Sequence, residues 1–544
     1  MTRPTNPASA LGTALRSTSL DVLRTGGACD AVVVGAGAAG GLAALALTEA
    51  GLRVLVLDAG WPAQHHRSLF RRATVGLVQR LADPEGLRFI PPRFVPRVRS
   101  TISAVGRWRQ PVQSTNYAWA FAPSAFVDDR DCPYATEEGA PFAWIRARQL
   151  GGRMTIPMHG RLYFRFGPDD LRPTDGLTPP WPVDSGELDD WYGRVERRLG
   201  LLGSYDRVPW LPDSELATEL APSVDQAELQ ARLAARWPFA RPVLGRHAPP
   251  PDYLEAAART GRLLCRQGAV VNGVEVDAAG CVSGVTWIDE AARSAQRVHA
   301  PLVFLCASTL ESTRILLLSK SADSPTGLGD GSGFLGRHLM DHLLVKAEGE
   351  APPLVEPPAA VVPGHCVFLP RFDARHSPAP APGRGFGVQL HQYAGGMGRS
   401  YFVMTSFGEM LPQMENRVTL DPTRRDAWGI PTLRIECRHS AADIRLANMQ
   451  AESLRDLAAA LDVTISQWTR IPDEPGASIH ECGTARMGTE PSNSVLDRHN
   501  QCWEARGLYV TDGSSFPSQA YQNPTLTILA LTERACRHAL SGES

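Results

Sequence analysis

The sequence predicts an α/β protein that combines a Rossmann-like dinucleotide-binding domain with an interleaved second domain, of α+β type, built on an antiparallel sheet. Two patterns carry this prediction. A buried strand, a glycine-rich turn, a helix and a second strand follow one another from Cys29 onward, and short runs typical of strands fill much of residues 366–437. A chain of 544 residues is also too long for one compact core, so two domains are expected.

Composition narrows the classes of partner. Lys and Arg number 55 and Asp and Glu number 57, which gives a formal net charge of -2. A balance so close to neutral gives no sign of a nucleic-acid or membrane-surface partner. The apolar stretches are interrupted by glycines and charged residues, so we expect no membrane span.

The cysteines and the N-terminus indicate a compartment. Ten cysteines occur singly, with no C-x-x-C pair and no zinc-type spacing, so neither a disulfide framework nor a metal site is expected. Residues 1–28 lack a sustained apolar core and a twin-arginine pair, and we interpret them as a short leader or edge segment rather than a signal peptide. A cytoplasmic location is therefore predicted.

The first predicted element is the strand Ala31–Val34, whose apolar, mostly β-branched residues suit burial on both faces of a parallel sheet. Gly35, Gly37 and Gly40 follow in G-x-G-x-x-G spacing. The first glycine permits a tight turn, the second lets the backbone approach a pyrophosphate, and the third lets the next helix pack closely on the strand. The N-terminus of that helix offers free N–H groups and a partial positive charge to the phosphates.

The second strand ends in an acid. The apolar run Val54–Leu57 leads to Asp58, which lies 18 residues after Gly40, about where an acid would bind the ribose hydroxyls. An acid there argues against a 2′-phosphorylated nucleotide but does not separate NAD from FAD. The dinucleotide site predicted from this unit consists of Gly35, Gly37, Ala38, Ala39, Gly40, Asp58 and Ala59.

The middle of the chain predicts the second domain. Residues 439–469 are expected to be helical, and the proline-rich stretches 352–363 and 377–384 are expected to be surface loops. Five short alternating runs are assigned to one antiparallel sheet: Cys366–Leu369, Gly387–Tyr393, Tyr401–Phe407, Arg417–Leu420 and Thr432–Cys437.

The C-terminal region predicts an apolar helix that begins at Pro524, with Asn523 as its N-cap. Asn is among the best N-caps, and Pro is favoured at the first helical position. The free N–H groups of this helix would stabilise a negative charge close to them, such as that of a reduced flavin. A strand over Leu508–Val510 would deliver Asp512 and Gly513 to the same place.

Two C-terminal motifs resemble the glucose–methanol–choline (GMC) oxidoreductases. Residues 480–488 read H-E-C-G-T-A-R-M-G, and further on D-G-S-S-F-P is followed by N-P-T-L-T. With the N-terminal dinucleotide unit, these motifs match the family in order along essentially the whole chain. The family pairs a histidine of the first motif with a histidine or asparagine of the second, and these positions are His480 and Asn523, 43 residues apart. The His/Asn version is more similar to pyranose oxidases and gluconate-type sugar dehydrogenases than to glucose oxidase.

The resemblance implies FAD as the cofactor. The segment from Trp144 to Arg153 resembles the family's second glycine-rich segment, which runs along the pyrophosphate and the flavin edge. Many relatives continue through a short His-Trp segment, where some attach FAD covalently to a histidine. Here a longer segment leads to His159, so non-covalent FAD is expected and His159 is interpreted as an ordinary histidine. The further cofactor residues implied are Arg148, Gly151, Gly152, Val270, Asp512, Gly513, Pro524 and Thr525.

The resemblance also implies alcohol oxidation, in which a hydride leaves the alcohol carbon for flavin N5 and a proton leaves its oxygen. Histidine, with an unperturbed pKa of about 6.5, suits the proton, so His480 is the predicted base and Asn523 the predicted hydrogen-bond partner of the same oxygen. The expected substrate is a sugar-like or polyol alcohol, such as an aminoglycoside, and oxygen or another acceptor would take the electrons. Gln389 and His391, on one predicted strand, are the candidate substrate contacts. The other histidines, such as His338, His342 and His499, are interpreted as structural or exposed.

Three alternatives to alcohol oxidation stay open: a flavin-containing lyase on the same fold, an FAD subunit of a membrane-linked sugar-acid dehydrogenase complex, and an NAD-dependent dehydrogenase. No oligomeric state follows from the sequence.

The predicted segments of the two domains alternate along the chain. We expect a leader at 1–28, FAD-binding segments at 29–170, 241–345 and 475–544, and substrate-domain segments at 171–240 and 346–474.

Overall fold

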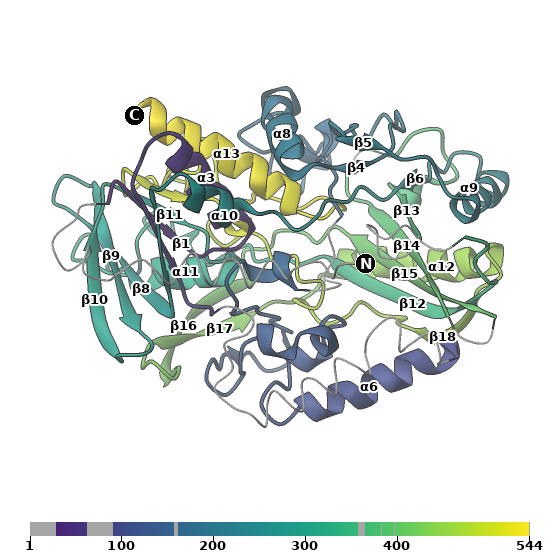
Figure 1. Ribbon diagram of the computed structural model, residues 1–544, viewed down its shortest axis with the longest axis horizontal. Helices are drawn as coiled ribbons and strands as arrows, with labels where there is room; N and C mark the ends of the chain where they lie inside the picture. The colour runs from purple at the N-terminus through teal and green to yellow at the C-terminus, as the bar shows by residue number, and fades with distance from the viewer. Residues whose placement is uncertain are drawn as a thin grey trace.

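Two sheet systems lie at opposite ends of the long axis of the molecule in the computed structural model, and the C-terminal segment passes between them (Figure 1). The predicted leader at 1–28 and His159 lie outside the described residues. The structure describes residues 29–61, 91–156, 162–356, 365–381, 383–395 and 398–542.

The first sheet is parallel and five-stranded, and it confirms the predicted strands at 31–34, 54–57 and 508–510. Its central strand is buried along its whole length, because helices pack on the sheet and their apolar residues join one core with it. Helix α3 (Ala38–Glu49) packs between α10 (Tyr253–Arg259) and α13 (Thr525–Ser541). The strand order is β19 (Leu508–Val510), β11 (Leu302–Leu305), β1 (Ala31–Val34), β2 (Val54–Asp58) and β7 (Leu263–Gln267).

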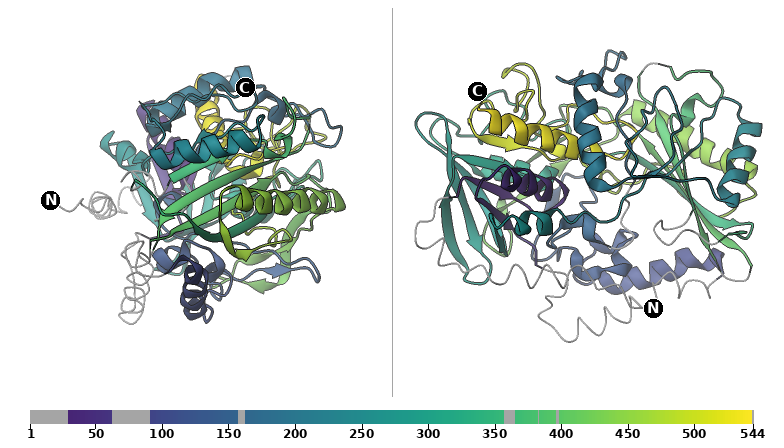
Figure 2. Two further views of the ribbon diagram at one scale, coloured as in Figure 1. Left: turned by 90° about the vertical axis from the view of Figure 1, so that its right-hand side faces the viewer. Right: turned by 45° about the horizontal axis from the view of Figure 1, so that its top comes forward.

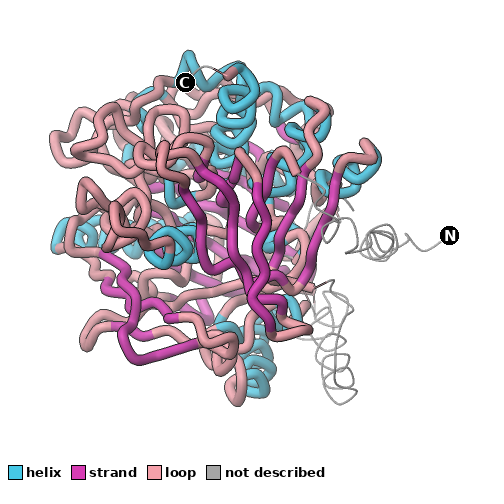
Figure 3. The backbone as a smooth tube through the Cα atoms, turned by 90° about the vertical axis from the view of Figure 1, so that its left-hand side faces the viewer, coloured by secondary structure: helices cyan, strands magenta, loops and turns pink. Residues whose placement is uncertain are grey.

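A three-stranded antiparallel sheet covers the outer end of this half of the molecule, and Figure 3 looks onto that end. It is followed by β11 and by helix α11 (Thr309–Leu318), which packs against β8 (Ala269–Val276). The sheet consists of β10 (Ser294–His299), β9 (Val282–Asp289) and β8 (Ala269–Val276).

The second large sheet is antiparallel and six-stranded, and it confirms the predicted strands at 366–369, 387–393 and 401–407. Helices α12 (Ala441–Ala460) and α9 (Val224–Arg236) cover its outer face, where apolar side chains of strands and helices form a core of their own (Figure 2). The strand order is β18 (Thr464–Trp468), β12 (Leu343–Ala351), β15 (Ser400–Gly408), β14 (Phe386–Ala394), β13 (His365–Leu369) and β6 (Val243–Leu244).

The inner face of this sheet carries polar groups, as the strand register shows. Gln389 of β14 is opposite Phe368 of β13, and His391 is opposite Cys366. Residues that are directly opposite each other share a face, and residues two apart on a strand do so as well. None of these four residues belongs to the core under α12, so they lie on the face turned towards the C-terminal segment.

Two predictions for the second domain are wrong. The runs at 417–420 and 432–437 belong to a separate small sheet of β16 (Arg417–Arg425), β17 (Pro431–Glu436) and β3 (Ala135–Thr136). Arg314 of α11 fixes this sheet, since its guanidinium donates to the Pro431 carbonyl and pairs with Asp426 at 2.7 Å. The helix predicted over 439–469 ends at Ala460, because Asp462 turns the chain at φ 55° and 464–468 pairs with β12.

The remaining elements connect these sheets. No helix in the described part of the chain is long and apolar enough to cross a membrane. The other helices are α6 (Val95–Gly106), α7 (Pro168–Leu171) and α8 (Ser185–Leu199), and β4 (Leu202–Gly203) pairs with β5 (Thr218–Glu219). Short 3₁₀ turns occupy Pro92–Phe94, Gln113–Thr115, Trp119–Phe121, Pro123–Ala125, Gly152–Thr155, Phe372–Ala374 and Gly513–Ser515.

Candidate active site

The glycines of the first turn differ in what surrounds them. A Cβ on Gly35 would lie 2.5 Å from the Cys306 carbonyl oxygen, and one on Gly40 would lie 1.9 Å from the Gly35 carbonyl oxygen. Backbone packing therefore requires both. Around Gly37, by contrast, no described atom lies within 4 Å of the position of a Cβ. Gly37 thus borders space that a side chain would fill, as expected for a backbone that a pyrophosphate approaches.

The second glycine-rich segment reaches the same place. Gly151 and Gly152 both have positive φ angles, 86° and 60°, and a Cβ on Gly152 would lie 2.9 Å from the Gly37 Cα. Helix α3 starts here with Ala38 and Ala39, and no side chain caps it. Uncapped N–H groups at a helix start suit a phosphate, so these residues fit the FAD pyrophosphate.

Asp58 ties the end of β2 to the glycine turn. One carboxylate oxygen accepts from the Ala36 N–H and the other from the Gly60 N–H, both at 2.6 Å. Burial raises the pKa of this carboxyl, while the two backbone donors oppose the rise. The predicted acid is therefore at the expected edge of the sheet, where it also holds the turn in shape.

Arg148 lies over the same edge. Its Nε donates to the Ala59 carbonyl at 3.0 Å, and its guanidinium stacks on the Trp428 ring at 3.8 Å. Among the described residues its buried Nη2 has no hydrogen-bond partner, and the nearest acid, Glu290, is 3.6 Å away. A buried cationic donor with an unused N–H beside Asp58 fits a cofactor that carries phosphates and hydroxyls.

Three further predicted cofactor residues have structural partners. Val270 is buried in β8 opposite Ile288. Asp512 accepts from the Ser514 N–H at 3.1 Å and so caps the turn that follows β19. A Cβ on Gly513 would lie 2.7 Å from the Glu481 carbonyl oxygen, so this glycine lets the end of β19 pack against the segment that carries His480.

The structure brings His480 and Asn523 together. The Asn523 Nδ2 lies 3.2 Å from the His480 Nε2, and the Asn523 Oδ1 accepts from the Gln389 Nε2 at 2.7 Å. Three segments that are remote in sequence thus meet through side chains: the loop before residue 481, the start of α13, and β14. One predicted substrate contact, Gln389, is therefore a neighbour of the predicted catalytic pair.

The prediction that Asn523 caps the last helix is wrong. Helix α13 begins at Thr525 with Pro524 in the N-cap position, and no side chain caps it. The Asn523 carboxamide does not fold back on the helix because Gln389 and His480 bond both of its ends. Pro524 and Thr525 follow this pair directly, so the uncapped helix start adjoins it.

Sequence reasoning misses His342, which it interprets as structural or exposed. Its Nδ1 lies 2.8 Å from the Nδ1 of His480, and its Nε2 bonds to the carbonyl oxygen of Ala520. Burial lowers the pKa of His342 to about 4. The Phe407 ring packs on both imidazoles. The sequence gives no signal for this contact, because 138 residues separate the two histidines.

Asp341 holds the backbone of the same loop. Its carboxylate accepts from the N–H groups of His480 at 2.9 Å, Gly476 at 2.8 Å and Ser478 at 3.1 Å. Burial raises the pKa of Asp341 to about 6. Consecutive residues, Asp341 and His342, therefore fix the backbone and the ring of His480 respectively.

The residue before His480 has a strained backbone. Ile479 has φ 60°, which is rare for a β-branched residue. Arg153 donates to the Ile479 carbonyl at 2.8 Å, and Gln519 donates to the His480 carbonyl at 2.7 Å. These bonds offset the strain and present the His480 ring to Asn523.

His391, the other predicted substrate contact, lies farther along β14 on the face of Gln389. Its Nε2 is 3.8 Å from the Cys366 Sγ, and no described group bonds its buried Nδ1. Burial lowers the pKa of His391 to about 4. The structure does not bond His391 to the predicted catalytic pair.

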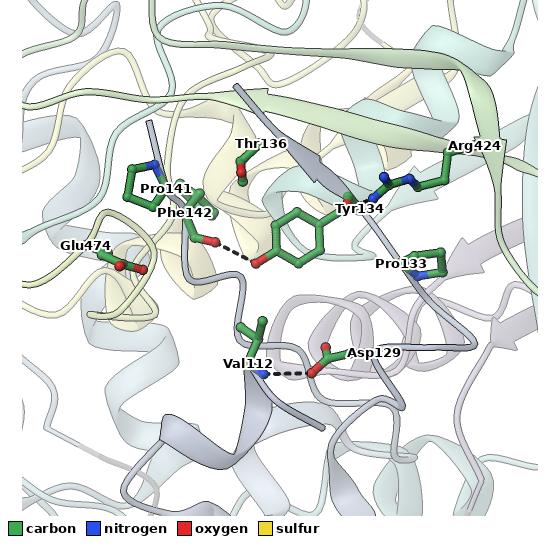
Figure 4. A pocket seen from close by; sticks show the side chains of 9 residues that line it. All are labelled: Val112, Asp129, Pro133, Tyr134, Thr136, Pro141, Phe142, Arg424 and Glu474. Atoms are coloured by element: carbon green, nitrogen blue, oxygen red, sulfur yellow. Dashed lines mark hydrogen bonds between the residues drawn. The ribbon is translucent and has the colours of Figure 1, made fainter. Parts of the chain in front are cut away.

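A surface hollow of about 330 Å³ lies away from these groups, beside the small sheet that includes β16 (Figure 4). Tyr134 crosses it and donates to the Phe142 carbonyl, while Asp129, Arg424 and Glu474 supply charge around its rim. None of the predicted site residues lines this hollow. The cluster around His480 is therefore the candidate active site.

Known proteins resemble the chain in these same regions. Residues 412–532 match the family model described as GMC oxidoreductase, and residues 30–86 match one described as an FAD binding domain. A 2-methyl-1,2-propanediol dehydrogenase of Mycolicibacterium austroafricanum is 27% identical over 504 residues, covering 79% of this chain and 88% of the relative. A 6'''-hydroxyparomomycin C oxidase of Streptomyces lividus is 25% identical over 564 residues, covering 93% and 90%. The crystal structure of a pyridoxine 4-oxidase from Mesorbium loti has the same fold, with a TM-score of 0.60 and 18% identity over 95% of this chain and all of that one.

Proposed function

Because the chain belongs to the GMC oxidoreductase family and is an FAD-dependent enzyme acting on CH–OH groups, we propose that His480 is the base that accepts the hydroxyl proton of its substrate. The observation that carries this proposal is the convergence of His480 Nε2 and Asn523 Nδ2, 3.2 Å apart, at the start of an uncapped helix. Two side chains this close together can contact the same alcohol oxygen.

His480 and Asn523 have different roles at the alcohol oxygen. When bound, FAD supplies the acceptor for the hydride. The His480 Nε2 accepts the hydroxyl proton, and the Asn523 Nδ2 donates to the oxygen as negative charge develops on it. The Gln389 Nε2 holds the Oδ1 end of Asn523, so the Nδ2 end keeps facing His480.

We further propose that FAD is held without a covalent bond by both glycine-rich segments and the adjoining side chains. Gly37 and Gly152 would let the pyrophosphate approach, Arg148 would bind a phosphate or hydroxyl with its unused N–H, and Asp58 would bind the ribose. Denaturation of the purified protein should then release all of its FAD into the filtrate. Flavin that stays with the precipitated chain would contradict this.

The proposed substrate is a polyol or sugar-like alcohol, including aminoglycosides. The relatives named above act on a diol and on an aminoglycoside, and the inner face of the six-stranded sheet offers Gln389 next to the catalytic pair and His391 two residues farther along β14. Carboxamide and imidazole groups bind neutral hydroxyls through single hydrogen bonds. We propose these two side chains as contacts for hydroxyls other than the one oxidised.

An anaerobic titration tests this function. The purified protein should show a flavin absorbance peak near ~450 nm that bleaches with one class among diols, sugars and aminoglycosides. Bleaching identifies the substrate class, and regaining the peak on adding oxygen distinguishes an oxidase from a dehydrogenase that needs another acceptor. A yellow protein that no alcohol bleaches would instead favour a lyase or the FAD subunit of a membrane-linked complex.

Two organisational features are also proposals. We propose that the FAD-binding domain consists of 29–170, 241–345 and 475–544 and the substrate domain of 171–240 and 346–474, supported by the separate parallel and antiparallel sheets. We propose a cytoplasmic location, supported by ten cysteines that are all free thiols. Fractionation of the host cell with an antibody to the protein would check the location.

A further inference from the structure

We propose that His342 is a positioning residue that keeps the proton of neutral His480 on Nδ1, so that the unprotonated Nε2 is the base. This inference rests on the proposed role of His480. It follows from the direction in which each hydrogen bond must run along a chain of five groups: the Ala520 carbonyl, His342, His480, Asn523 and Gln389.

The direction is set at the Ala520 end. A carbonyl oxygen only accepts, so the His342 Nε2 that bonds to it must carry a hydrogen. A neutral imidazole carries one ring hydrogen, so the His342 Nδ1 then presents a lone pair. His342 is 3% exposed and pairs with no acid among the described residues, and a buried imidazole in such a site stays neutral.

The direction of the next hydrogen bond fixes the tautomer of His480. Its Nδ1 lies 2.8 Å from the His342 Nδ1, which presents a lone pair, so the His480 Nδ1 must be the donor of that bond. The His480 Nε2 then presents its own lone pair, and the neighbouring Asn523 Nδ2 is a donor. Gln389 fixes that end of Asn523 by donating to the opposite oxygen. Every donor in this series of five hydrogen-bonded groups therefore meets an acceptor.

The reverse direction fails at two places. It would require a second hydrogen on His342, and thus a positive charge in a buried site where the Phe407 ring lies against the imidazole. The carboxylate of the preceding residue, Asp341, is bonded to the backbone of 476–480 rather than to this ring. It would also point an N–H of His480 Nε2 at the Nδ2 donor of Asn523.

The same hydrogen bond to His342 also stabilises His480 after it has become protonated. When the His480 Nε2 accepts the hydroxyl proton, the ring becomes a cation whose Nδ1–H is still donated to the His342 lone pair. The O–H bond of the alcohol breaks and the N–H bond forms, with no further proton moved along the chain. A neutral imidazole thereby stabilises the cation without competing for its proton.

The tautomer can be measured directly on the FAD-bound protein. Histidine labelled with ¹⁵N gives distinct shifts for ring nitrogens with and without a hydrogen, and His480→Gln and His342→Asn identify the two rings by the signals they remove. We expect His480 to carry its hydrogen on Nδ1 and His342 on Nε2 at neutral pH. A hydrogen on the Nε2 of neutral His480, or a doubly protonated His342, would overturn the inference.

A pair of variants tests the consequence for catalysis. His342→Asn keeps an acceptor oxygen at the place of Nδ1, whereas His342→Leu removes it. We expect His342→Leu to slow anaerobic flavin reduction about 10- to 100-fold with little change in KM, and His342→Asn to restore most of the rate. Equal losses in both variants, or none in His342→Leu, would contradict a positioning role. FAD content checks that each variant folds, and the tautomer measurement on the natural chain decides the matter if His342→Leu does not.

The two proposals can fail separately. If His480→Ala reduces its flavin as fast as the natural chain, the proposed base is wrong, while the labelled histidines still report which nitrogen carries the hydrogen. If His480→Ala is slow but His480 carries its hydrogen on Nε2, the base stands and the role of His342 is wrong.

Discussion

Replacing Gly37 with alanine should weaken FAD binding without harming the fold. Gly37 has φ -73° and ψ -157°, which alanine adopts freely, and no described atom lies within 4 Å of the new methyl group. Replacement of glycine by alanine at a compatible site stabilises a protein by about 0.4–1 kcal/mol, because the unfolded chain loses freedom. The apoprotein of Gly37→Ala should therefore unfold no earlier than the natural chain.

The methyl group would occupy the space assigned to the pyrophosphate. Forcing one extra methyl group into a packed contact costs about 1–3 kcal/mol. That free energy corresponds to a Kd for FAD raised about 5- to 150-fold. Titration of the apoprotein with FAD, followed by quenching of flavin fluorescence, measures the change. An unchanged Kd would refute the placement of the pyrophosphate at Gly37.

Gly40→Ala is the matched control in the same turn. Its Cβ would lie 1.9 Å from the Gly35 carbonyl oxygen, which is backbone and cannot move aside. We expect this variant to lose about 3 kcal/mol or more of unfolding free energy, whether or not FAD is present. Similar stability for Gly37→Ala and Gly40→Ala would show that the two glycines do not differ as the structure indicates.

Three further predictions test other parts of the account. Gln389→Leu should slow flavin reduction about 5- to 10-fold by freeing the Asn523 carboxamide to turn, and an unchanged rate of flavin reduction at saturating substrate would contradict this. Arg314→Ala should lower the free energy of unfolding by about 3–5 kcal/mol, measured by urea denaturation, because it leaves the Asp426 carboxylate buried without its partner at 2.7 Å. His342→Leu should make the free energy of unfolding fall less as the pH is lowered. The pKa of the His342 ring is about 4 in the folded protein against a usual 6.5, so the unfolded chain binds more protons between these pH values. That difference removes up to about 3 kcal/mol as pH falls from 6.5 to 4, and an unchanged pH dependence would show that His342 is not kept neutral by burial.

Local patterns are sufficient for the nucleotide-binding unit and for most strands. The strand at 31–34, the turn at Gly35 and the strand ending at Asp58 depend on residues close in sequence, and the structure has them where the sequence predicts them. His480 and Asn523 are found as a pair only through their motifs. Their contact depends on the six-stranded sheet, whose residue Gln389 holds Asn523 in place.

The predictions that are wrong concern residues whose structure depends on contacts between distant segments. Alternation shows that 417–420 and 432–437 are strands, but it does not show which sheet they join, and their sheet is held by Arg314 of α11, which is more than 100 residues away in the sequence. The segment 464–468 follows a helix and would continue it, yet pairing with β12 makes it a strand. His342 is missed for the same reason, since its partner is 138 residues away.

The central claim is that His480 is the base of an FAD-dependent alcohol oxidation, and single-turnover reduction of the bound flavin tests it most directly. The natural chain, His480→Ala and His499→Ala would be mixed anaerobically with the substrate found by titration. His499 is a matched control, because its ring stacks on His538 and not on any residue of the site. We expect His480→Ala to bind FAD normally but to reduce it about 10² times more slowly or worse, and His499→Ala to reduce it at the natural rate. Reduction of His480→Ala at the natural rate would contradict it.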